Sequence, residues 1–145
     1  MASGDITIDG YAGVSLGASM RGGTIHVKGD AGPRCGVAMK GGDIIVEGKI
    51  GYLSGFMAHA GRIIALGGAD EACADSLWGG EVWVAGPIAS LGVDSKTVQP
   101  ADSEVQGKFK HCWQRADLMI PREAGRRSYL PNASGTLKAG MQTHG

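Results

Sequence analysis

The sequence has few of the residues that build disulfides, aromatic clusters or membrane spans. Aromatic side chains make up 6% of its 145 residues, and there are only three cysteines. An odd number of cysteines with no C-x-x-C pair argues against a disulfide framework or a zinc site, and favours a cytoplasmic setting. No apolar run approaches the roughly 20 residues that span a bilayer. The start, MASGDITIDG, lacks the basic and apolar regions of a signal peptide, so we expect no membrane partner.

The chain as a whole also lacks net charge, although its two parts have net charges of opposite sign. The formal net charge is 0. Residues 1–94 hold 6 Lys and Arg against 10 Asp and Glu, a balance of −4. Residues 95–145 hold 8 against 4, a balance of +4. A balance of this size without an interleaved basic and aromatic array argues against a nucleic-acid partner.

Glycine, by contrast, is abundant and regularly placed. It supplies 26 of the 145 residues, well above the roughly 7% of an average protein. Five segments align at a constant period of 19, and each alternates side chains between two glycines, which is a strand signal. They are GDITIDG (4–10), GTIHVKG (23–29), GDIIVEG (42–48), GRIIALG (61–67) and GEVWVAG (80–86).

A period of 19 residues is too short for a βαβ unit, which needs about 30, but it suits a coil of short strands joined by tight turns. Coils stacked about 4.8 Å apart bury a continuous core that no single coil buries alone. The sequence therefore predicts an all-β, parallel β-helix (a solenoid) over 1–94 and an irregular C-terminal arm over 95–145. The inward positions of its strands are Ile6/Ile8, Ile25/Val27, Ile44/Val46, Ile63/Ala65 and Val82/Val84.

The repeated glycines are predicted to be structural. They lie at corners, where a positive φ or the close stacking of coils excludes a Cβ atom. Asp70, Ala74 and Asp75 depart from the pattern, which predicts that the fourth repeat leaves the regular core or meets a partner. The glycines of the G-x-x-G-x-x-x-G motif are Gly10, Gly13, Gly17, Gly29, Gly32, Gly36, Gly48, Gly51 and Gly55.

A second inward-facing strand is expected in each coil. Cys35 and Cys73 share one of its columns two coils apart, roughly 9.6 Å, which is beyond the reach of a disulfide. We interpret both as small buried apolar residues. The columns are Leu16/Ala18/Met20, Cys35/Val37/Met39, Ser54/Phe56/Ala58 and Cys73/Asp75/Leu77.

The sequence offers no catalytic or metal-binding constellation. His26 has an outward strand position and is interpreted as a surface residue. In one outward column Thr24 and Arg62 alternate with acids, which is typical of a solvated face. A single asparagine argues against the asparagine ladders of pectin-degrading helices. No two histidines have metal-ligand spacing: they are His26, His59, His111 and His144.

Three stretches carry the full glycine motif in register: GYAGVSLGASMRGG (10–23), GDAGPRCGVAMKGG (29–42) and GKIGYLSGFMAHAG (48–61). They resemble the GXGXG domain family. That domain forms the C-terminal right-handed β-helix of the glutamate synthase large subunit. It also occurs as free-standing subunits of glutamate synthase-like complexes, including N-methylglutamate synthase, and in one of the subunits of formylmethanofuran dehydrogenase. The resemblance covers about residues 4–94 and implies a right-handed helix.

The resemblance also implies a function without catalytic, cofactor-binding or metal-binding residues in this chain. In the family, glutaminase chemistry and the FMN site belong to other units, which the helix holds together. We therefore expect a scaffold subunit of an oxidoreductase complex in nitrogen metabolism, of the N-methylglutamate synthase type. FMN and iron–sulfur groups would lie on its glutamine amidotransferase-like and FMN-binding partner subunits. The alternatives are a protein like the GXGXG subunit of formylmethanofuran dehydrogenase, or a solenoid enzyme acting on carbohydrate; a homo-oligomer is compatible with each.

An apolar patch is expected on the outward side of the strands, because two outward columns become apolar toward the later repeats. A contiguous apolar patch usually marks an interface, and tryptophan is enriched among binding hot spots. A partner subunit is the expected occupant, and the alternative is the arm over 95–145, in which a short helix near 111–119 is compatible with the sequence. The predicted interface residues are Ile45, Ile64, Leu66 and Trp83. The first coil is likewise expected to be covered by another chain or by the arm.

Overall fold

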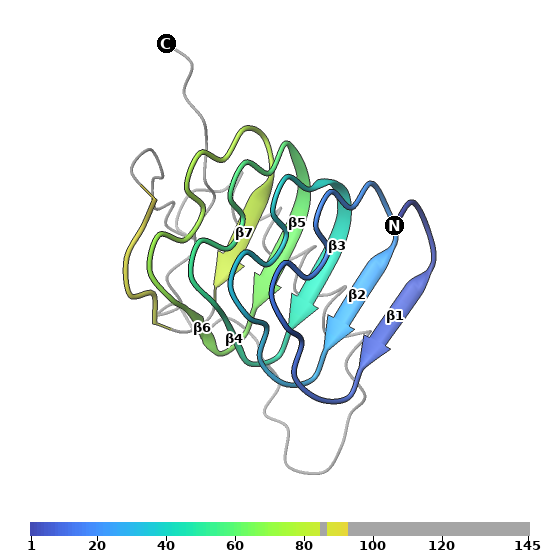
Figure 1. Cartoon of the computed structure of the whole chain (residues 1–145), viewed down its shortest axis with the longest axis horizontal. Coiled ribbons are helices and arrows are strands. Elements are labelled where there is room, and N and C mark those ends of the chain that lie inside the picture. The colour runs from blue at the N-terminus through green and yellow to red at the C-terminus, as the bar shows by residue number, and fades with distance from the viewer. Residues whose placement is uncertain (85–86, 93–145) are drawn as a thin grey trace, which may run out of the picture.

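The described part of the chain is an all-strand solenoid. A computed structural model describes residues 1–84 and 87–92, and it stacks them as about four coils whose equivalent residues lie about 19 positions apart (Figure 1). The fold and the repeat length predicted from the glycine spacing are confirmed. The expected arm over 95–145 and its short helix lie outside the described residues.

One long sheet and one short sheet form the walls of the coils. The main sheet has the order β1-β2-β3-β5-β7, and β4 pairs with β6 in the second sheet; every pairing is parallel. The strands of the described residues are β1 (Asp5–Ile8), β2 (Thr24–Val27), β3 (Lys40–Val46), β4 (Lys49–Ile50), β5 (Ala60–Ala65), β6 (Gly68–Ala69) and β7 (Glu81–Val84).

The register of the main sheet follows the sequence repeat. Ile6 pairs with Ile25, Ile25 with Ile44, Ile44 with Ile63, and Ile63 with Val82. These residues form an inward ladder, and from the second coil onward each is at most 4% exposed. Each coil thus buries its apolar side against its neighbours, which is the arrangement that the strand alternation predicts.

The predicted second strand is wrong, because the chain forms tight turns at residues 14–19, 33–38 and 52–57. In the first of these turns Ser15, Gly17 and Ser19 have φ values of 62°, 67° and 55°. A positive φ at every second residue is incompatible with a strand. Side chains in these turns nevertheless alternate between inside and outside, as they would in a strand, which explains the wrong prediction. The first and third members of the later columns are buried as expected: Cys35, Met39, Ser54, Ala58, Cys73 and Leu77.

The fourth coil stays in the regular stack, so the predicted departure from the core at this point is also wrong. The Asp70 amide donates to the Ile50 carbonyl at 3.0 Å, and the Ala74 amide donates to the Ser54 carbonyl at 2.8 Å. Ala74 occupies the glycine position of its turn with a φ of 60° and is fully buried. The stacking hydrogen bonds therefore tolerate alanine at this corner.

The first coil leaves part of its apolar side open. Ile6 belongs to the inward ladder but is 46% exposed, and Tyr11 and Val14 of the same coil are 66% and 65% exposed. The described coils therefore leave these side chains without a cover. Coverage of the first coil by another chain stays a prediction.

Candidate functional site

The motif glycines are needed mainly where one coil lies on the next. For four of the nine (Gly29, Gly32, Gly48 and Gly51), an added Cβ would fall less than 3.0 Å from a heavy atom of the preceding coil; for Gly17, Gly36 and Gly55, it would fall less than 3.0 Å from the core side chains of Ile44, Ile63 and Val82. The exceptions are Gly10 and Gly13 of the first coil, which meet nothing within 4 Å. Gly29 illustrates the rule, because its Cβ would lie 2.9 Å from the Gly10 carbonyl oxygen. The expectation of a positive φ at Gly29 is wrong; the structure supports only the stacking reason.

Replacing Gly29 by valine should lower the free energy of unfolding by about 2 kcal/mol, because the new side chain overpacks against backbone that cannot move aside. Gly10→Val is the matched control, since Gly10 has the same position in the preceding coil and open space around it. Urea unfolding of the two variants would measure the difference. Equal midpoints would contradict the assignment of this column to coil stacking.

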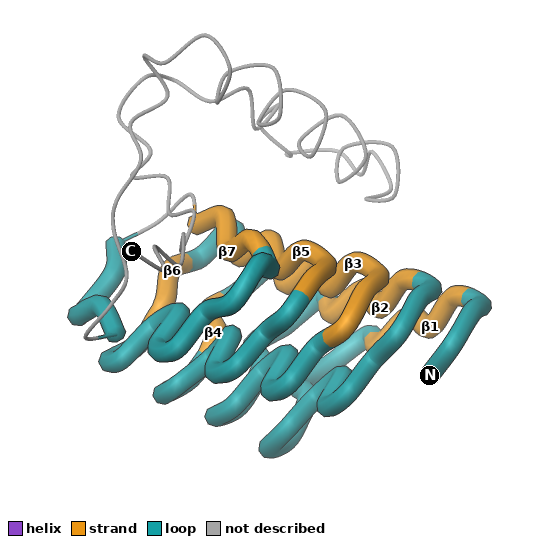
Figure 2. Tube along the Cα trace, turned by 90° about the horizontal axis from the view of Figure 1, so that it is seen from above, coloured by secondary structure: helices purple, strands orange, loops and turns teal. Residues whose placement is uncertain are grey.

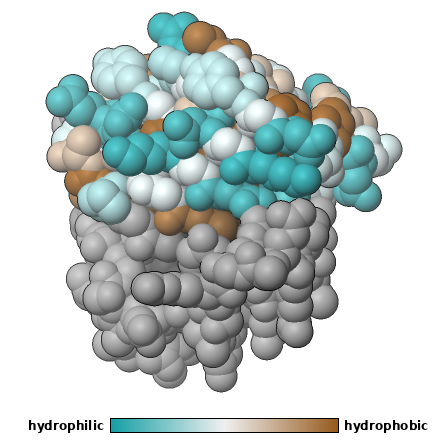
Figure 3. Space-filling model, turned by 90° about the horizontal axis from the view of Figure 1, so that it is seen from below, coloured by the Kyte–Doolittle hydropathy of each residue, from teal (hydrophilic) through white to brown (hydrophobic). Residues whose placement is uncertain are grey.

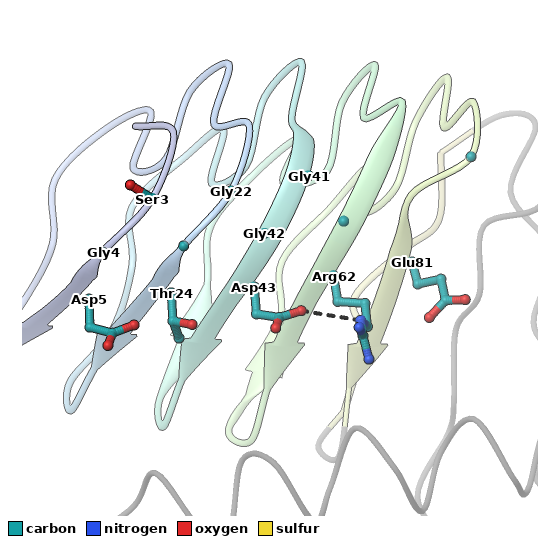
Figure 4. A pocket seen from close by; sticks show the side chains of 13 residues that line it. Ser3, Gly4, Asp5, Gly22, Thr24, Gly41, Gly42, Asp43, Arg62 and Glu81 are labelled. Carbon is teal, nitrogen blue, oxygen red and sulfur yellow. Dashed lines mark ion pairs between the residues drawn. The ribbon is translucent and has the colours of Figure 1, made fainter.

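A groove with a volume of about 780 Å³ runs along the corner where the main strands begin (Figure 4). Its floor is glycine backbone, including Gly23, Gly42 and Gly61, whose φ values are 85°, 87° and 94°. Few other residues adopt these angles, so the corner carries no side chains and stays hollow. The sequence signal for this groove is the glycine pair at 22–23, 41–42 and 79–80, which by itself predicts only a turn.

One wall of the groove is the outward column of strand residues that alternates acids with other groups. Arg62 Nε lies 3.2 Å from Asp43 Oδ1, so at least one of the acids is neutralised by its neighbour. Acids two coils apart are separated by roughly 9.6 Å, which is too far for them to share a proton or a metal ion. The column is Asp5, Thr24, Asp43, Arg62 and Glu81, and its side chains point to one side of the sheet in Figure 4.

No group of three His, Cys, Asp or Glu side chains that could hold a metal ion occurs among residues 1–84 and 87–92. Figure 3 shows one face of the molecule, where the described hydrophobic residues lie in small separate groups among hydrophilic ones. That face therefore offers no broad apolar surface among its described residues. The apolar residues on the outer side of the main sheet are instead buried, as described below.

The interpretation of His26 as a surface residue is wrong. His26 is 3% exposed, and its Nε2 lies 2.7 Å from Oε1 of Glu47 in the next coil, whose side chain is 17% exposed. His26 lies two residues further along its strand than Thr24, which lines the groove. The His26–Glu47 pair is therefore a buried polar contact on the outward side of the sheet, outside the groove. Asp9, in the same column as Glu47, instead forms a solvent-exposed ion pair with Lys28 at 2.7 Å. The hydrogen bond and charge of Lys28 hold the pKa of the Asp9 carboxyl below its usual value.

The predicted interface residues lie together, but they are not open to solvent. Ile45, Ile64, Leu66 and Trp83 are 1%, 2%, 7% and 1% exposed. Ile45, Ile64 and Trp83 pair directly across β3, β5 and β7, and the Trp83 Nε1–H donates to Glu81 Oε2 at 3.1 Å. The expectation that this patch is exposed is therefore wrong, while its role as a partner interface stays a prediction.

Cys35 and Cys73 are buried, as the sequence predicts. Burial is the main cause that raises the pKa of the Cys35 thiol to about 12, and the nearby Cys73 adds to it. Thiols in this state are unreactive because the thiolate is the nucleophile.

Native protein at pH 8 should therefore leave Cys35 and Cys73 unmodified by iodoacetamide, whereas protein unfolded in urea should be alkylated at both. Peptide mass spectrometry would locate the modification. The unfolded sample is the control for intrinsic reactivity. Rapid alkylation of Cys35 in the native protein would contradict its burial in the coil.

No protein-family model matches the chain, and no curated protein matches it. In the part of the chain that the structure describes, no helix is long and apolar enough to cross a membrane.

Proposed function

We propose that the chain is a non-catalytic scaffold subunit of a glutamate synthase-like complex, of the N-methylglutamate synthase type. The observation that carries this proposal is the unbroken stacking of coils in one register across β1, β2, β3, β5 and β7. Five strands spaced about 4.8 Å apart make a spacer roughly 19 Å long. A sheet whose neighbouring coils are joined by parallel ladders is suited to hold two other units at a fixed separation.

The glycine pattern connects this shape to the family that the motif resembles. In the structure, a Cβ added at Gly29, Gly32, Gly48 or Gly51 would collide with the preceding coil, and one added at Gly36 or Gly55 would collide with a core side chain. The motif and the coil geometry thus have a common physical cause. This common cause supports the proposed relation to that family.

Partner recovery is the most direct test. The tagged chain, expressed at its natural level in its own source, should co-purify with a glutamine amidotransferase-like subunit and an FMN-binding subunit. The complex should show the visible absorbance of a bound flavin, and the isolated chain should show none. Mass spectrometry of the purified material would identify the partners.

The competing function is a solenoid enzyme that acts on carbohydrate. A panel of polysaccharides incubated with the isolated chain, followed by a reducing-sugar assay, should therefore give no turnover. Turnover that persists in the pure chain and disappears on Asp43→Asn, in the groove wall, would overturn the scaffold proposal. Recovery of the chain without any stable partner would also count against it.

A further inference from the structure

The outer face of the main sheet is buried although it points away from the solenoid core. His26, Ile45, Ile64 and Trp83 form one ladder across β2, β3, β5 and β7. Their exposed fractions are 3%, 1%, 2% and 1%, and Leu66 of the neighbouring column is 7% exposed. Side chains this inaccessible are covered by other atoms, so a further layer lies over this face.

The described coils do not supply that layer. Their turns (teal) and the strands β4 and β6 (orange) lie on one side of the main strands in Figure 2. The side chains that face this interior belong to the other strand columns, since a Cβ added at Gly17 in the turn would meet Ile25 and Ile44. None of these described turns and neither strand of the second sheet lies over the outer face in this view.

We propose that the chain's own C-terminal segment, residues 95–145, docks on the outer face of the main sheet through an amphipathic stretch at 109–120. Pro121 ends this stretch, as is common just beyond a helix. As a helix, residues 109–120 would be about 18 Å long, close to the roughly 19 Å width of five strands. The apolar residues recur at helical spacing: Phe109, Cys112, Trp113, Ala116, Met119 and Ile120.

Charge favours this occupant over a second copy of the chain. The segment has a balance of +4. A second copy would present the same acidic excess, and like charges facing each other weaken an interface. The outward columns carry more acids than bases: Asp5, Asp9, Asp43, Glu47 and Glu81 against Lys28 and Arg62.

The test cuts the full chain after it has folded. A protease recognition site is inserted between Asp94 and Ser95 and cleaved under native conditions, and the product is analysed by size-exclusion chromatography with light scattering. We expect the segment to co-elute with the solenoid at the mass of one chain. Trp83→Ala should reduce the retained segment at least about tenfold, as loss of a buried aromatic anchor predicts. Tyr52→Ala is the control, because Tyr52 lies in a turn and is 51% exposed, and it should leave retention unchanged.

Trp113→Glu is the second variant, since it changes no residue of the solenoid and should release the cut segment while the solenoid stays folded by circular dichroism. Release of the segment from the cut parent would overturn the proposal and leave the outer face for a partner subunit. If light scattering instead gave the mass of a dimer after the segment had been released, the outer face would be assigned to a second copy of the chain, and the proposal would be overturned. Full retention in both Trp83→Ala and Trp113→Glu would overturn docking through the apolar stretch. None of these outcomes depends on the proposed scaffold role.

Discussion

Gly42→Ala should lower the free energy of unfolding by about 3 kcal/mol, although it adds a single methyl group. Gly42 has a φ of 87°, and its added Cβ would lie 2.8 Å from the Gly23 carbonyl oxygen and 2.7 Å from Met20 Cε. The left-handed backbone costs alanine about 1–2 kcal/mol. Overpacking against a neighbouring coil adds about 1–3 kcal/mol, because the carbonyl cannot rotate away. Urea unfolding followed by circular dichroism would measure the sum.

The chain provides two controls that separate these contributions. Gly4 has a φ of 95° but meets nothing within 4 Å, so Gly4→Ala should show the backbone cost alone. Gly10 has neither a positive φ nor a neighbour within 4 Å, so Gly10→Ala should leave stability nearly unchanged. The expected order of destabilisation is Gly42→Ala, then Gly4→Ala, then Gly10→Ala. Equal effects for Gly42→Ala and Gly4→Ala would show that stacking distance contributes nothing at this corner.

The solenoid could be predicted from the sequence because its main determinant is periodic. Strand residues 19 positions apart pair directly, as Asp5 with Thr24 and Thr24 with Asp43 show, so the alignment of repeats is also the register of the sheet. The turns could not be predicted in the same way. Side-chain alternation indicates which positions face inward, but it does not indicate the sign of φ. The positive φ at Ser15 and Ser19 accompanies stacking hydrogen bonds to the next coil, such as the one that the Ser19 N–H donates to the Val37 carbonyl at 2.9 Å.

The outer face of the sheet shows the other limit of sequence reasoning. The prediction that Ile45, Ile64 and Trp83 lie together is confirmed. Their burial, however, depends on which atoms lie over them, and the alternation of side chains along a strand does not indicate this. His26 was misjudged for the same reason, because an outward position was equated with solvent. The apolar residues that follow His26 in its column were the available signal that this side of the sheet is covered.

The buried pair on that face gives the last prediction. Glu47→Ala should lower the free energy of unfolding by about 2–3 kcal/mol, because it leaves His26 Nε2 buried without the acceptor that now lies 2.7 Å away. Asp9→Ala is the matched control, since Asp9 has the same column position but pairs with Lys28 in solvent. An exposed pair contributes little, so this control should unfold at nearly the parent midpoint.

A double-mutant cycle with His26→Ala isolates the part of the loss that belongs to the pair itself, as distinct from other contacts of Glu47. If the two side chains stabilise each other, the double variant should be more stable than the sum of the single losses implies, by about 1 kcal/mol or more. Thermal and urea unfolding of the four proteins provide the measurement. A coupling energy near zero, or a Glu47→Ala loss no larger than that of Asp9→Ala, would mean that water reaches His26 on the outer face of the sheet and that its contact with Glu47 contributes no more than an exposed pair.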